Sequence, residues 1–570
     1  MKSIKILRFG ATLFLSASLF IGCENYLDVD TDTDNPKDAP LSFLLTGVEF
    51  NASIVGNYRN NSGSILSTYT HSMTSRGEDD QYGSKPDNAK FENDWTLIYS
   101  TLNDVKVLID KSTVSGDRVY LGIGQLYKAY LMSIAVDLWG DVPYTQSLKL
   151  EQGIRNPKFD NQKDIYNDIF RLIDEAKVNL ASNAGLSKPS PKEDLIYGGD
   201  AAKWIRFANT FKLKLYNQVR LSDVFNQADF DKLVAENNFF KSIDDDFEFM
   251  HYKDVSPRNL RNLYYRESYE STQFGSYQSP WFYEIMKGMN PNILNGNPDP
   301  RVKYYFFNQL VPGQLPPDTA VGDDPKADYW DKSTGFFSVR FGSVGPNRDK
   351  SAERCYTYPG IFPCGGRYDD GQGTPKQNGN VIAVDDNSGT GQAAKRMLTY
   401  DEFLYIKAEL ISKGKMAGDV RGTLKSAVEA SFAKVDQVVA KSGTTQVVPK
   451  LIGLAATNTY ITRMLTEFDN GSSDKKFEII MTQKWIGTYG DPLDQYNDYR
   501  RTGFPKLADP NSATKEYQLN NLDAWPLNDL ETRLNGLYQF SIYWPLSEII
   551  SNSSVPVQKN PSSYKIFWNN

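Results

Sequence analysis

Apolar residues recur every three or four positions in eight stretches of the chain, which is the spacing of an amphipathic helix. Four of these stretches lie between about residues 90 and 222, and four between about 397 and 487. The pattern predicts eight helices in two blocks. The positions that carry it are Trp95, Ile98, Leu102, Val105 and Ile109; Tyr120, Ile123, Tyr127, Tyr130, Ile134 and Leu138; Ile165, Ile169, Leu172, Ala176 and Leu180; Trp204, Phe207, Phe211, Leu215 and Val219; Phe403, Ile406 and Leu410; Leu424, Val428, Val435 and Val439; Ile461, Leu465 and Phe468; and Phe477, Ile480 and Trp485.

The eight predicted helices form four antiparallel pairs, each about the size of a tetratricopeptide unit. A pair of this size cannot bury its apolar stripe alone and must stack on its neighbours. The strict tetratricopeptide consensus is not present. We therefore expect a mostly α-helical fold, an α superhelix of about four tetratricopeptide-like pairs.

The segment between about residues 240 and 395 has a different pattern. Short aromatic runs such as 281–283, 304–307 and 336–337 are broken by Gly, Pro, Asn and Asp. This predicts a loop-rich insertion with short strands. The segment 488–570 is similarly irregular, so the helical scaffold is expected to comprise about 90–222 and 397–487.

The N-terminus has the pattern of a bacterial lipoprotein leader. Lys2, Lys5 and Arg8 precede the apolar stretch 11–21, which is too short to span a bilayer. Gly22 stands directly before Cys23, as in a lipobox. We predict a signal peptide over 1–22, an acylated Cys23, a flexible acidic tether over 23–40 and one domain over 41–570. Acyl chains on Cys23 would hold the protein to a membrane essentially permanently.

Composition narrows the class of function. The formal charge of −7 gives no basic surplus with which to neutralise phosphates, so we expect no nucleic-acid partner. Aromatic residues make up 13% of the chain, whereas histidine, the commonest general base, occurs twice. Nucleophile-elbow, zinc-protease and phosphate-loop motifs are absent from the sequence. Adjacent acids in loops are usually solvated. We therefore predict a binding protein and no enzyme.

Two further features concern cysteine and metals. Cys355 and Cys364 lie eight residues apart in a loop-like segment, so a local disulfide is the expectation and two separate thiols are the alternative. The alternating acids Asp28, Asp30 and Asp32 resemble the start of an EF-hand loop, but the required Gly and Glu are missing. We expect no cofactor, with a structural calcium ion at one of the acidic clusters left open.

Ligand contacts are expected from flat rings with polar partners at their edges. The candidates occupy two regions, the loop that leads into the first predicted helix and the aromatic insertion. Core packing is the alternative for every ring, most of all for the one at the start of the first helical stripe. The candidates are Arg76, Asp80, Tyr82 and Trp95 in the first region and Trp281, Tyr283, Tyr329 and Trp330 in the second.

Several short blocks together resemble the SusD/RagB lipoproteins. They run through nearly the whole mature chain in the family's order, beginning with Cys23 and Tyr26-Leu27-Asp28. The blocks are Leu138-Trp139-Gly140-Asp141-Val142-Pro143-Tyr144, Trp204-Ile205-Arg206-Phe207-Ala208-Asn209, Tyr405-Ile406-Lys407-Ala408-Glu409, Gln483-Lys484-Trp485, Tyr499-Arg500-Arg501-Thr502-Gly503-Phe504-Pro505, Tyr543-Trp544-Pro545-Leu546-Ser547-Glu548-Ile549 and Phe567-Trp568.

Two of these blocks also have plain structural readings. The Gly140 to Pro143 stretch has the residues of a helix stop followed by a turn. Arg500 and Arg501 beside Asp494 and Asp498 are typical of a buried ion network.

The resemblance implies a right-handed superhelix with an irregular ligand-binding face. It further implies an outer-membrane, cell-surface lipoprotein of a Gram-negative bacterium that acts as a lid over a SusC-like, TonB-dependent transporter. The expected ligand is an oligosaccharide, with a peptide as the alternative; a surface glycoside hydrolase and a protein-only helical-repeat adaptor are the other hypotheses. The block at Tyr543 departs from the family's commoner pattern, which indicates a divergent subfamily and leaves the ligand class open.

Overall fold

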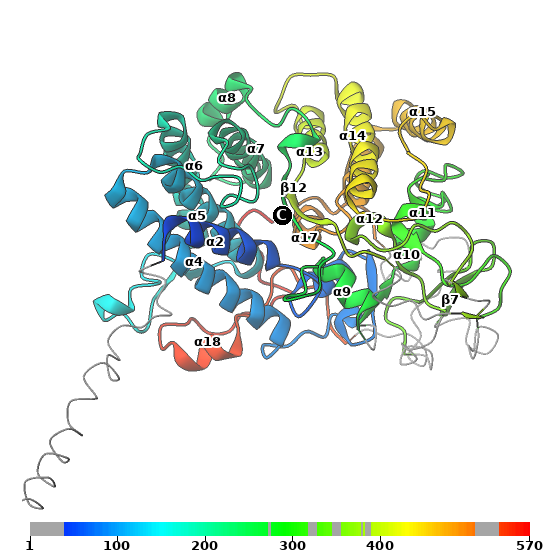
Figure 1. Cartoon of the computed structure of the whole chain (residues 1–570), viewed down its shortest axis with the longest axis horizontal. Coiled ribbons are helices and arrows are strands. Elements are labelled where there is room, and N and C mark those ends of the chain that lie inside the picture. Colours follow the sequence, from blue (N-terminus) through cyan, green and yellow to red (C-terminus); the bar gives the residue numbers. More distant parts are fainter. Residues whose placement is uncertain are drawn as a thin grey trace, which may run out of the picture.

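The computed structural model describes residues 39–271, 275–316, 328–344, 355–374, 376–377, 380–381, 389–507 and 535–569. The described chain is mostly helical, as predicted (Figure 1). The predicted lipobox and tether, and the EF-hand-like acids, lie outside the described residues. The helices are α2 Leu41–Ile54, α3 Gly63–Tyr69, α4 Ala89–Ser115, α5 Arg118–Trp139, α6 Gln162–Ser182, α7 Ala201–Val219, α8 Gln227–Glu236, α9 Leu263–Tyr269, α10 Pro280–Met286, α11 Val302–Tyr305, α12 Ile361–Cys364, α13 Tyr400–Ser412, α14 Val420–Lys441, α15 Ala455–Asn470, α16 Ser473–Gly487, α17 Pro492–Thr502 and α18 Leu546–Ser551.

The first helical block consists of α4 to α7, packed one against the next. Each helix buries most of the stripe that the sequence pattern marks, and α5 is buried on nearly all sides. Local signals set the ends. The side chains of Asn88, Asn161 and Asp200 accept backbone hydrogen bonds at the starts of α4, α6 and α7. Gly116 ends α4 with φ of 77°, a left-handed conformation that glycine adopts without strain.

The second block consists of α13 to α16. In Figure 1 it lies to the upper right of the first block, and α7 and α13 meet where the two blocks join. Helix α13 packs against both α14 and α16, and α15 packs against α14 and α16. The four predicted helix pairs are therefore all present.

The strands are short and, among the described residues, form six two-stranded antiparallel sheets. The pair β4–β12 has a structural role, because it brings together the two ends of the segment that separates the helical blocks. The pairs β1–β5 and β7–β8 position the candidate site described below. The strands are β1 Met73–Ser75, β2 Val142–Pro143, β3 Phe159–Asp160, β4 Phe247–Met250, β5 Ser276–Gln278, β6 Phe306–Phe307, β7 Asp328–Asp331, β8 Phe336–Val339, β9 Tyr358–Pro359, β10 Lys376–Gln377, β11 Asn380–Val381 and β12 Ala394–Leu398.

The C-terminal segment is more ordered than the sequence pattern predicted. We expected residues 488–570 to be irregular, but α17 and α18 lie there. Helix α17 escaped prediction because it buries charged side chains. Asp494, Asp498, Arg500 and Arg501 are all buried, so the helix has no apolar stripe of the usual kind.

The predicted disulfide between Cys355 and Cys364 is not formed in the structure. Cys355 and Cys364 are both buried, and no disulfide joins them, which contradicts the predicted local bridge. The Cys364 thiol instead donates a hydrogen bond to the carbonyl oxygen of Gly360 (3.6 Å).

Within the described ranges, none of the helices has the length and apolar character needed to cross a bilayer.

Candidate functional site

Three segments that are distant in the sequence meet at one place: residues 71–84, 339–344 and 535–540. Strand β1 pairs with β5, with Met73 opposite Gln278, and the Ser338 hydroxyl donates to the Gln278 carbonyl oxygen (2.6 Å). The Thr74 hydroxyl donates to the Val339 carbonyl oxygen (3.2 Å). These bonds set the first segment beside the end of β8.

Asp80 fastens the first two segments together. Its side chain is buried, and one carboxylate oxygen, Oδ2, accepts hydrogen bonds from the backbone N–H groups of Ser75 and Gly342, each at 3.1 Å. A carboxylate that accepts two buried backbone donors fixes both chains because each donor would otherwise be unpaired. Asp80 is therefore a positioning residue.

The C-terminal segment joins through Gln81 and Gln539. The Asn535 side-chain amide donates to the Gln81 side-chain oxygen (2.6 Å), and the backbone N–H groups of Asn535 and Gly536 donate to the Gln81 carbonyl oxygen at 2.9 and 3.1 Å. The Gln539 amide reaches the carbonyl oxygens of Tyr82 and Ser84, each at 3.4 Å. Residues 535–539 thus cover the end of the first segment.

Where the three segments meet, their rings form what we call the aromatic face: Tyr82, Phe341 and Tyr538, one from each segment. The Tyr82 ring lies between the other two, with ring centroids 5.7 Å from Phe341 and 5.5 Å from Tyr538. Tyr82 itself is buried, whereas Phe341 and Tyr538 are half-buried and present part of each ring at the surface. Half-exposed rings that are fixed from behind are suited to stacking against a flat apolar surface of a ligand.

His71 supports the face from behind. Its ring is stacked on Phe341, with centroids 4.0 Å apart and planes 17° from parallel, and its Nε2 lies 3.3 Å from the Tyr82 hydroxyl. Burial lowers the pKa of His71 to about 3. The imidazole is therefore neutral at physiological pH, and it acts as a flat packing surface rather than a source of charge.

The segment that carries Tyr82 also carries polar side chains that solvent reaches. Arg76 and Asp79 are half-buried, and Glu78 is exposed. Rings bordered by a guanidinium and carboxylates can stack on an apolar ligand surface and hydrogen bond to hydroxyl or amide groups at its edge. This arrangement is suited to binding.

The candidates in the first region divide into two groups. The structure brings Asp80 and Tyr82 together at the aromatic face, and Arg76 lies in the same segment, where its backbone N–H donates to the Gly275 carbonyl oxygen (3.1 Å). It places Trp95 elsewhere, in the core of the first helical block, where its ring packs edge-on against Trp139 with centroids 5.2 Å apart. Core packing, the alternative reading for Trp95, is what the structure shows.

The candidates in the insertion are mostly buried. Trp281 and Tyr283 lie on α10, and Tyr283 donates to the Asp331 carboxylate (2.7 Å). Tyr329 is buried and donates to Glu284 (2.9 Å), whereas Trp330 is half-buried on the same strand. Burial leaves Trp281, Tyr283 and Tyr329 without a free ring surface for a ligand. In this conformation they support the β7–β8 hairpin, whose second strand leads into Phe341.

Sequence reasoning missed the two part-exposed rings of the face. Phe341 ends the run that begins at Phe336, and Tyr538 stands beside Phe540. Period-two alternation across β8 could have marked Phe341 as lying beyond the strand end. Nothing in the sequence links Tyr538 to residues 71–84, because that contact depends on the long-range bonds of Gln81 and Gln539.

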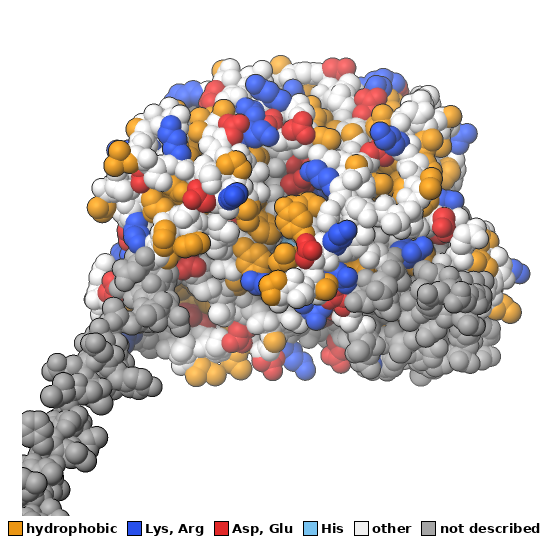
Figure 2. All heavy atoms as spheres, viewed as in Figure 1, with side chains coloured by type: hydrophobic (Ala, Val, Ile, Leu, Met, Phe, Trp, Pro, Cys, Tyr) orange, Lys and Arg blue, Asp and Glu red, His pale blue; other side chains and the backbone are white. Residues whose placement is uncertain are grey.

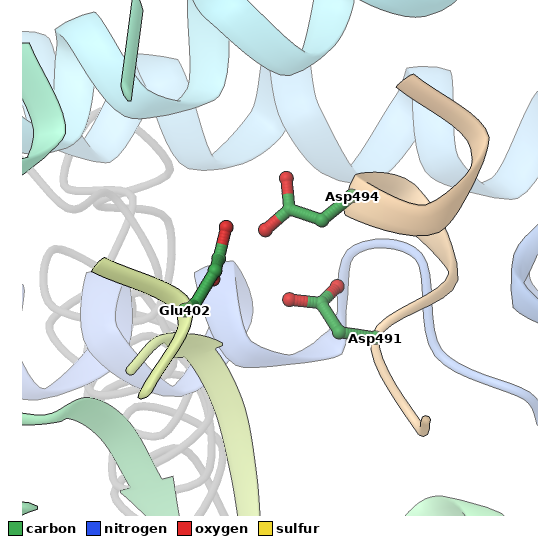
Figure 3. Close-up of side chains that lie close together, drawn as sticks. All are labelled: Glu402, Asp491 and Asp494. Carbon is green, nitrogen blue, oxygen red and sulfur yellow. The ribbon is translucent and has the colours of Figure 1, made fainter. Parts of the chain in front are cut away.

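A buried ion network lies where the helical blocks join. The carboxylates of Glu402 on α13, Asp494 on α17 and Asp491 just before α17 point toward one another (Figure 3). Each offers an oxygen within 4.8 Å of the others, the spacing of a possible cation site. Lys214 pairs with Asp494 and lies 3.5 Å from Glu402, and Lys484 lies 3.7 Å from Glu402.

These ammonium groups already supply the positive charge that a metal would bring. A calcium ion would have to displace Lys214 from Asp494, so this trio does not favour calcium. Burial raises the pKa of Asp491 to about 7, with the nearby Asp494 carboxylate acting in the same direction. For Asp494 burial also acts to raise the pKa, but Lys214 and Lys484 outweigh it and the pKa is lowered. The lysine ammonium groups of the network thus already balance the negative charge of its carboxylates.

Other described acids that stand next to a second acid in the sequence also have partners in the structure. Asp245 makes a two-pronged contact with Arg206 at 2.7 and 3.0 Å, and Asp246 pairs with Lys434 (2.8 Å). Asp369 accepts from the Asn308 amide (2.8 Å). In the view of Figure 2, basic and acidic side chains are interspersed over the described surface that faces the reader.

Comparisons with known proteins identify what the chain is similar to. Residues 34–329 and 346–522 match the model of the SusD-like family, described as starch-binding and associating with the outer membrane. A SusD homolog from Bacteroides fragilis has a TM-score of 0.62 at 17% identity, covering 90% of this chain and 93% of its own. A chitin-binding SusD homolog from Flavobacterium johnsoniae has a TM-score of 0.61 at 17% identity, covering 93% and 98%. At these identities the likeness shows a shared fold. No curated protein matches the chain.

Proposed function

Because the chain belongs to the SusD-like family, whose members are described as starch-binding and associated with the outer membrane, we propose that it is a cell-surface binding lipoprotein for oligosaccharides. It captures glycan chains outside the cell without altering them. It then acts as a lid that delivers them to a SusC-like, TonB-dependent transporter in the outer membrane.

The observation that carries this proposal is the aromatic face. Phe341 and Tyr538 present part of each ring at the surface, and Arg76 and Asp79 lie in the same segment as Tyr82. A sugar ring has apolar C–H faces that stack on aromatic rings and hydroxyl groups that bond to charged and amide side chains. Asp80 holds the face in place from beneath, so the site is largely formed before a ligand arrives.

The chain layout fits the same role. We propose that residues 1–22 are removed as a signal peptide, that Cys23 carries the acyl chains and that 23–40 tether the single domain 41–570 to the membrane. A tether of this length lets the domain move relative to the membrane while remaining bound to it. A hinged lid over a transporter needs that freedom.

A peptide is the alternative ligand, because the same rings and charges could contact peptide side chains and backbone. The description of the family as starch-binding and the chitin-binding title of one structural relative favour a glycan. A screen decides between the two: the purified protein is applied to a glycan array and, in parallel, to immobilised peptide pools. We expect oligosaccharides to be retained and peptides to pass.

The same screen separates the remaining hypotheses. Each retained ligand is incubated with the protein and analysed by mass spectrometry. Shortened products would identify a surface hydrolase and contradict the proposal. Retention of neither class, together with failure to copurify with a barrel transporter, would favour a protein-only adaptor.

A further inference from the structure

A cavity lies on the first helical block and shares no residue with the aromatic face. It has a volume of about 260 Å³ and is bounded by α4, α5 and the loop 144–149. Helices α4 and α5 pack side by side (Figure 1), and the apolar side chains of Leu102, Ile109 and Met132 form its floor. Its size suits one small molecule or the end unit of a longer one.

The loop that closes this cavity is held in a defined shape. The Tyr144 hydroxyl donates to the Asp168 carboxylate on α6. Asp160 accepts from the backbone N–H groups of Tyr144 (3.1 Å) and Thr145 (2.7 Å). Leu148, which lines the cavity, has φ of 58°, a left-handed conformation that is uncommon for a bulky residue. The wall is therefore fixed by specific contacts rather than by loose packing.

The charges around the cavity do not balance. Both of its carboxylates already have partners: Asp110 pairs with Lys106 (2.7 Å), and Asp168 bonds to Arg171 (2.6 Å) and Tyr144. Lys128 and Lys149 also line the cavity, and in the described part of the chain neither ammonium group makes a hydrogen bond or an ion pair. Two positive charges are thus left without an anion.

Lys128 is the better placed of the two. Its side chain is half-buried, and its ammonium group lies 5.0 Å from the centre of the Tyr144 ring. Burial lowers the pKa of Lys128, and the attraction of Asp168 opposes this only in part. A cation that has lost water without gaining an anion binds an incoming negative group more strongly than an exposed lysine does.

We propose that this cavity, which we call the lysine pocket, binds an acidic monosaccharide unit such as a hexuronate, with its carboxylate on Lys128 and its ring against the apolar floor. A lysine ammonium is a compact point charge that can pair with one carboxylate through a charge-assisted hydrogen bond. The apolar floor suits the C–H face of a pyranose, and Thr145 and Ser147 supply hydroxyl partners at the rim. Only the choice of a sugar as carrier of the carboxylate rests on the proposed function.

Titration of the purified protein with D-glucuronate, followed by calorimetry or ligand-observed NMR, tests the inference. D-glucose is the neutral probe of matched shape, and N-acetyl-L-glutamate is a carboxylate without a sugar ring. We expect glucuronate to bind and the two other probes to bind at least about tenfold more weakly. Binding should also weaken as sodium chloride is raised, because the pocket is open to solvent ions.

Variants locate the site. Lys128→Gln should weaken glucuronate binding about tenfold or more, the loss expected for one charge-assisted bond. The double variant Lys425→Gln/Glu429→Gln removes an exposed ion pair (2.7 Å) on α14, outside the pocket, without changing the net charge, and it should bind within about twofold of the unmodified protein. If Lys128→Gln does not fold, as judged by its melting curve, Lys149→Gln serves as the second variant, with a smaller loss expected.

Three outcomes would overturn the inference: glucuronate binding that Lys128→Gln or its substitute leaves unchanged, equal binding of N-acetyl-L-glutamate, or no binding of glucuronate. None of them bears on the aromatic face. Capture of oligosaccharides by that face, measured with the same Lys128→Gln protein, should be unaffected, so the two proposals fail separately.

Discussion

Arg501 on α17 places its guanidinium against both carboxylate oxygens of Glu409 on α13, and both side chains are buried. Arg220, directly after α7, reaches the same carboxylate (2.8 Å). One acid therefore joins the first helical block, the second block and the C-terminal segment. Of the network predicted from Arg500, Arg501, Asp494 and Asp498, Arg501 pairs with Asp498 (2.7 Å) and Asp494 pairs with Lys214. The Arg500 guanidinium instead donates to the backbone carbonyl oxygens of Asp137 (2.7 Å) and Phe540 (2.8 Å).

Replacing Glu409 by glutamine should strongly destabilise the fold. Burial alone would raise the pKa of Glu409, but Arg501 and Arg220 outweigh it and hold the pKa well below its usual range. The variant leaves two buried guanidinium groups facing a neutral amide, and breaking a buried pair in this way costs about 3–5 kcal/mol. Chemical denaturation of the two proteins measures the difference in the free energy of unfolding.

The matched control is an ion pair at the surface. Arg421 contacts both carboxylate oxygens of Asp469 at 2.8 and 3.0 Å, but the two side chains are 47% and 46% exposed. Asp469→Asn should cost no more than about 1 kcal/mol because solvent screens the pair. Equal losses in Glu409→Gln and Asp469→Asn would contradict the role given to the buried network.

Asp491 should make stability depend on pH in a defined direction. Its pKa is raised from 3.8 to about 7 by burial and by Asp494, so the folded protein holds this proton more tightly than the unfolded chain does. The stabilisation from this group is complete below about pH 4. It is lost as pH rises toward 7, by up to about 1.4 kcal/mol for each pH unit.

Asp491→Asn mimics the protonated form and removes this contribution. Urea denaturation at pH 5 and pH 8 gives the free energy of unfolding of both proteins. The value for the variant minus the value for the unmodified protein should be larger at pH 8 than at pH 5. The attraction of Lys395, 3.8 Å from Asp491, acts only on the ionised carboxylate and is already part of the pKa of about 7, so the sign of the comparison stands. A stability difference between the two proteins that stays the same at pH 5 and pH 8 would contradict the assignment.

Asp80→Ala should weaken ligand binding although the buried Asp80 side chain does not contact the ligand. The substitution leaves the backbone N–H groups of Ser75 and Gly342 without their acceptor, which costs about 1–3 kcal/mol for each donor. Gly342 follows Phe341, so the ring should lose its fixed position. We expect a lower melting temperature and a lower affinity for the captured oligosaccharide. Unchanged affinity would show that Asp80 does not position the face.

Cys23→Ser should release the protein from the membrane. This prediction rests on the sequence, because Cys23 lies outside the described residues. Without acyl chains the domain has nothing comparable to hold it to a bilayer. Fractionation should find the unmodified protein with the outer membrane and the variant in the soluble fraction. A variant that stays with the membrane would contradict the lipid anchor.

The fold could be predicted largely because helix pairs bury regular apolar stripes. Helix α6, with Ile165 to Leu180 on one face, is typical of this. Helix α17 could not be predicted in the same way, because its buried face contains charged residues such as Asp494 and Arg501. These charges are stable there only because residues on α7, α13 and α16 form ion pairs with the helix. Local sequence shows the charges but not the partners.

The site was harder to predict, because burial of aromatic residues is decided by tertiary packing. Tyr329 and Trp330 stand between Asp328 and Asp331, a setting equally compatible with exposure and with burial. The structure buries Tyr329 against Glu284 and uses Asp331 as the acceptor for Tyr283. Arg76, Asp80 and Tyr82 stay predicted ligand contacts, chosen because a polar, irregular loop ahead of a helix is where binding residues commonly lie.

The central claim is that the rings of the aromatic face hold an oligosaccharide without altering it. Calorimetric titration of the oligosaccharide selected by the array tests this most directly, with Phe341→Ala, Tyr538→Ala and their double variant. Trp95→Phe serves as an aromatic change outside the face. The account predicts a loss of about fivefold or more for each ring, no loss for Trp95→Phe and an unchanged ligand recovered afterwards. Full affinity in a folded double variant, or a shortened ligand, would contradict it.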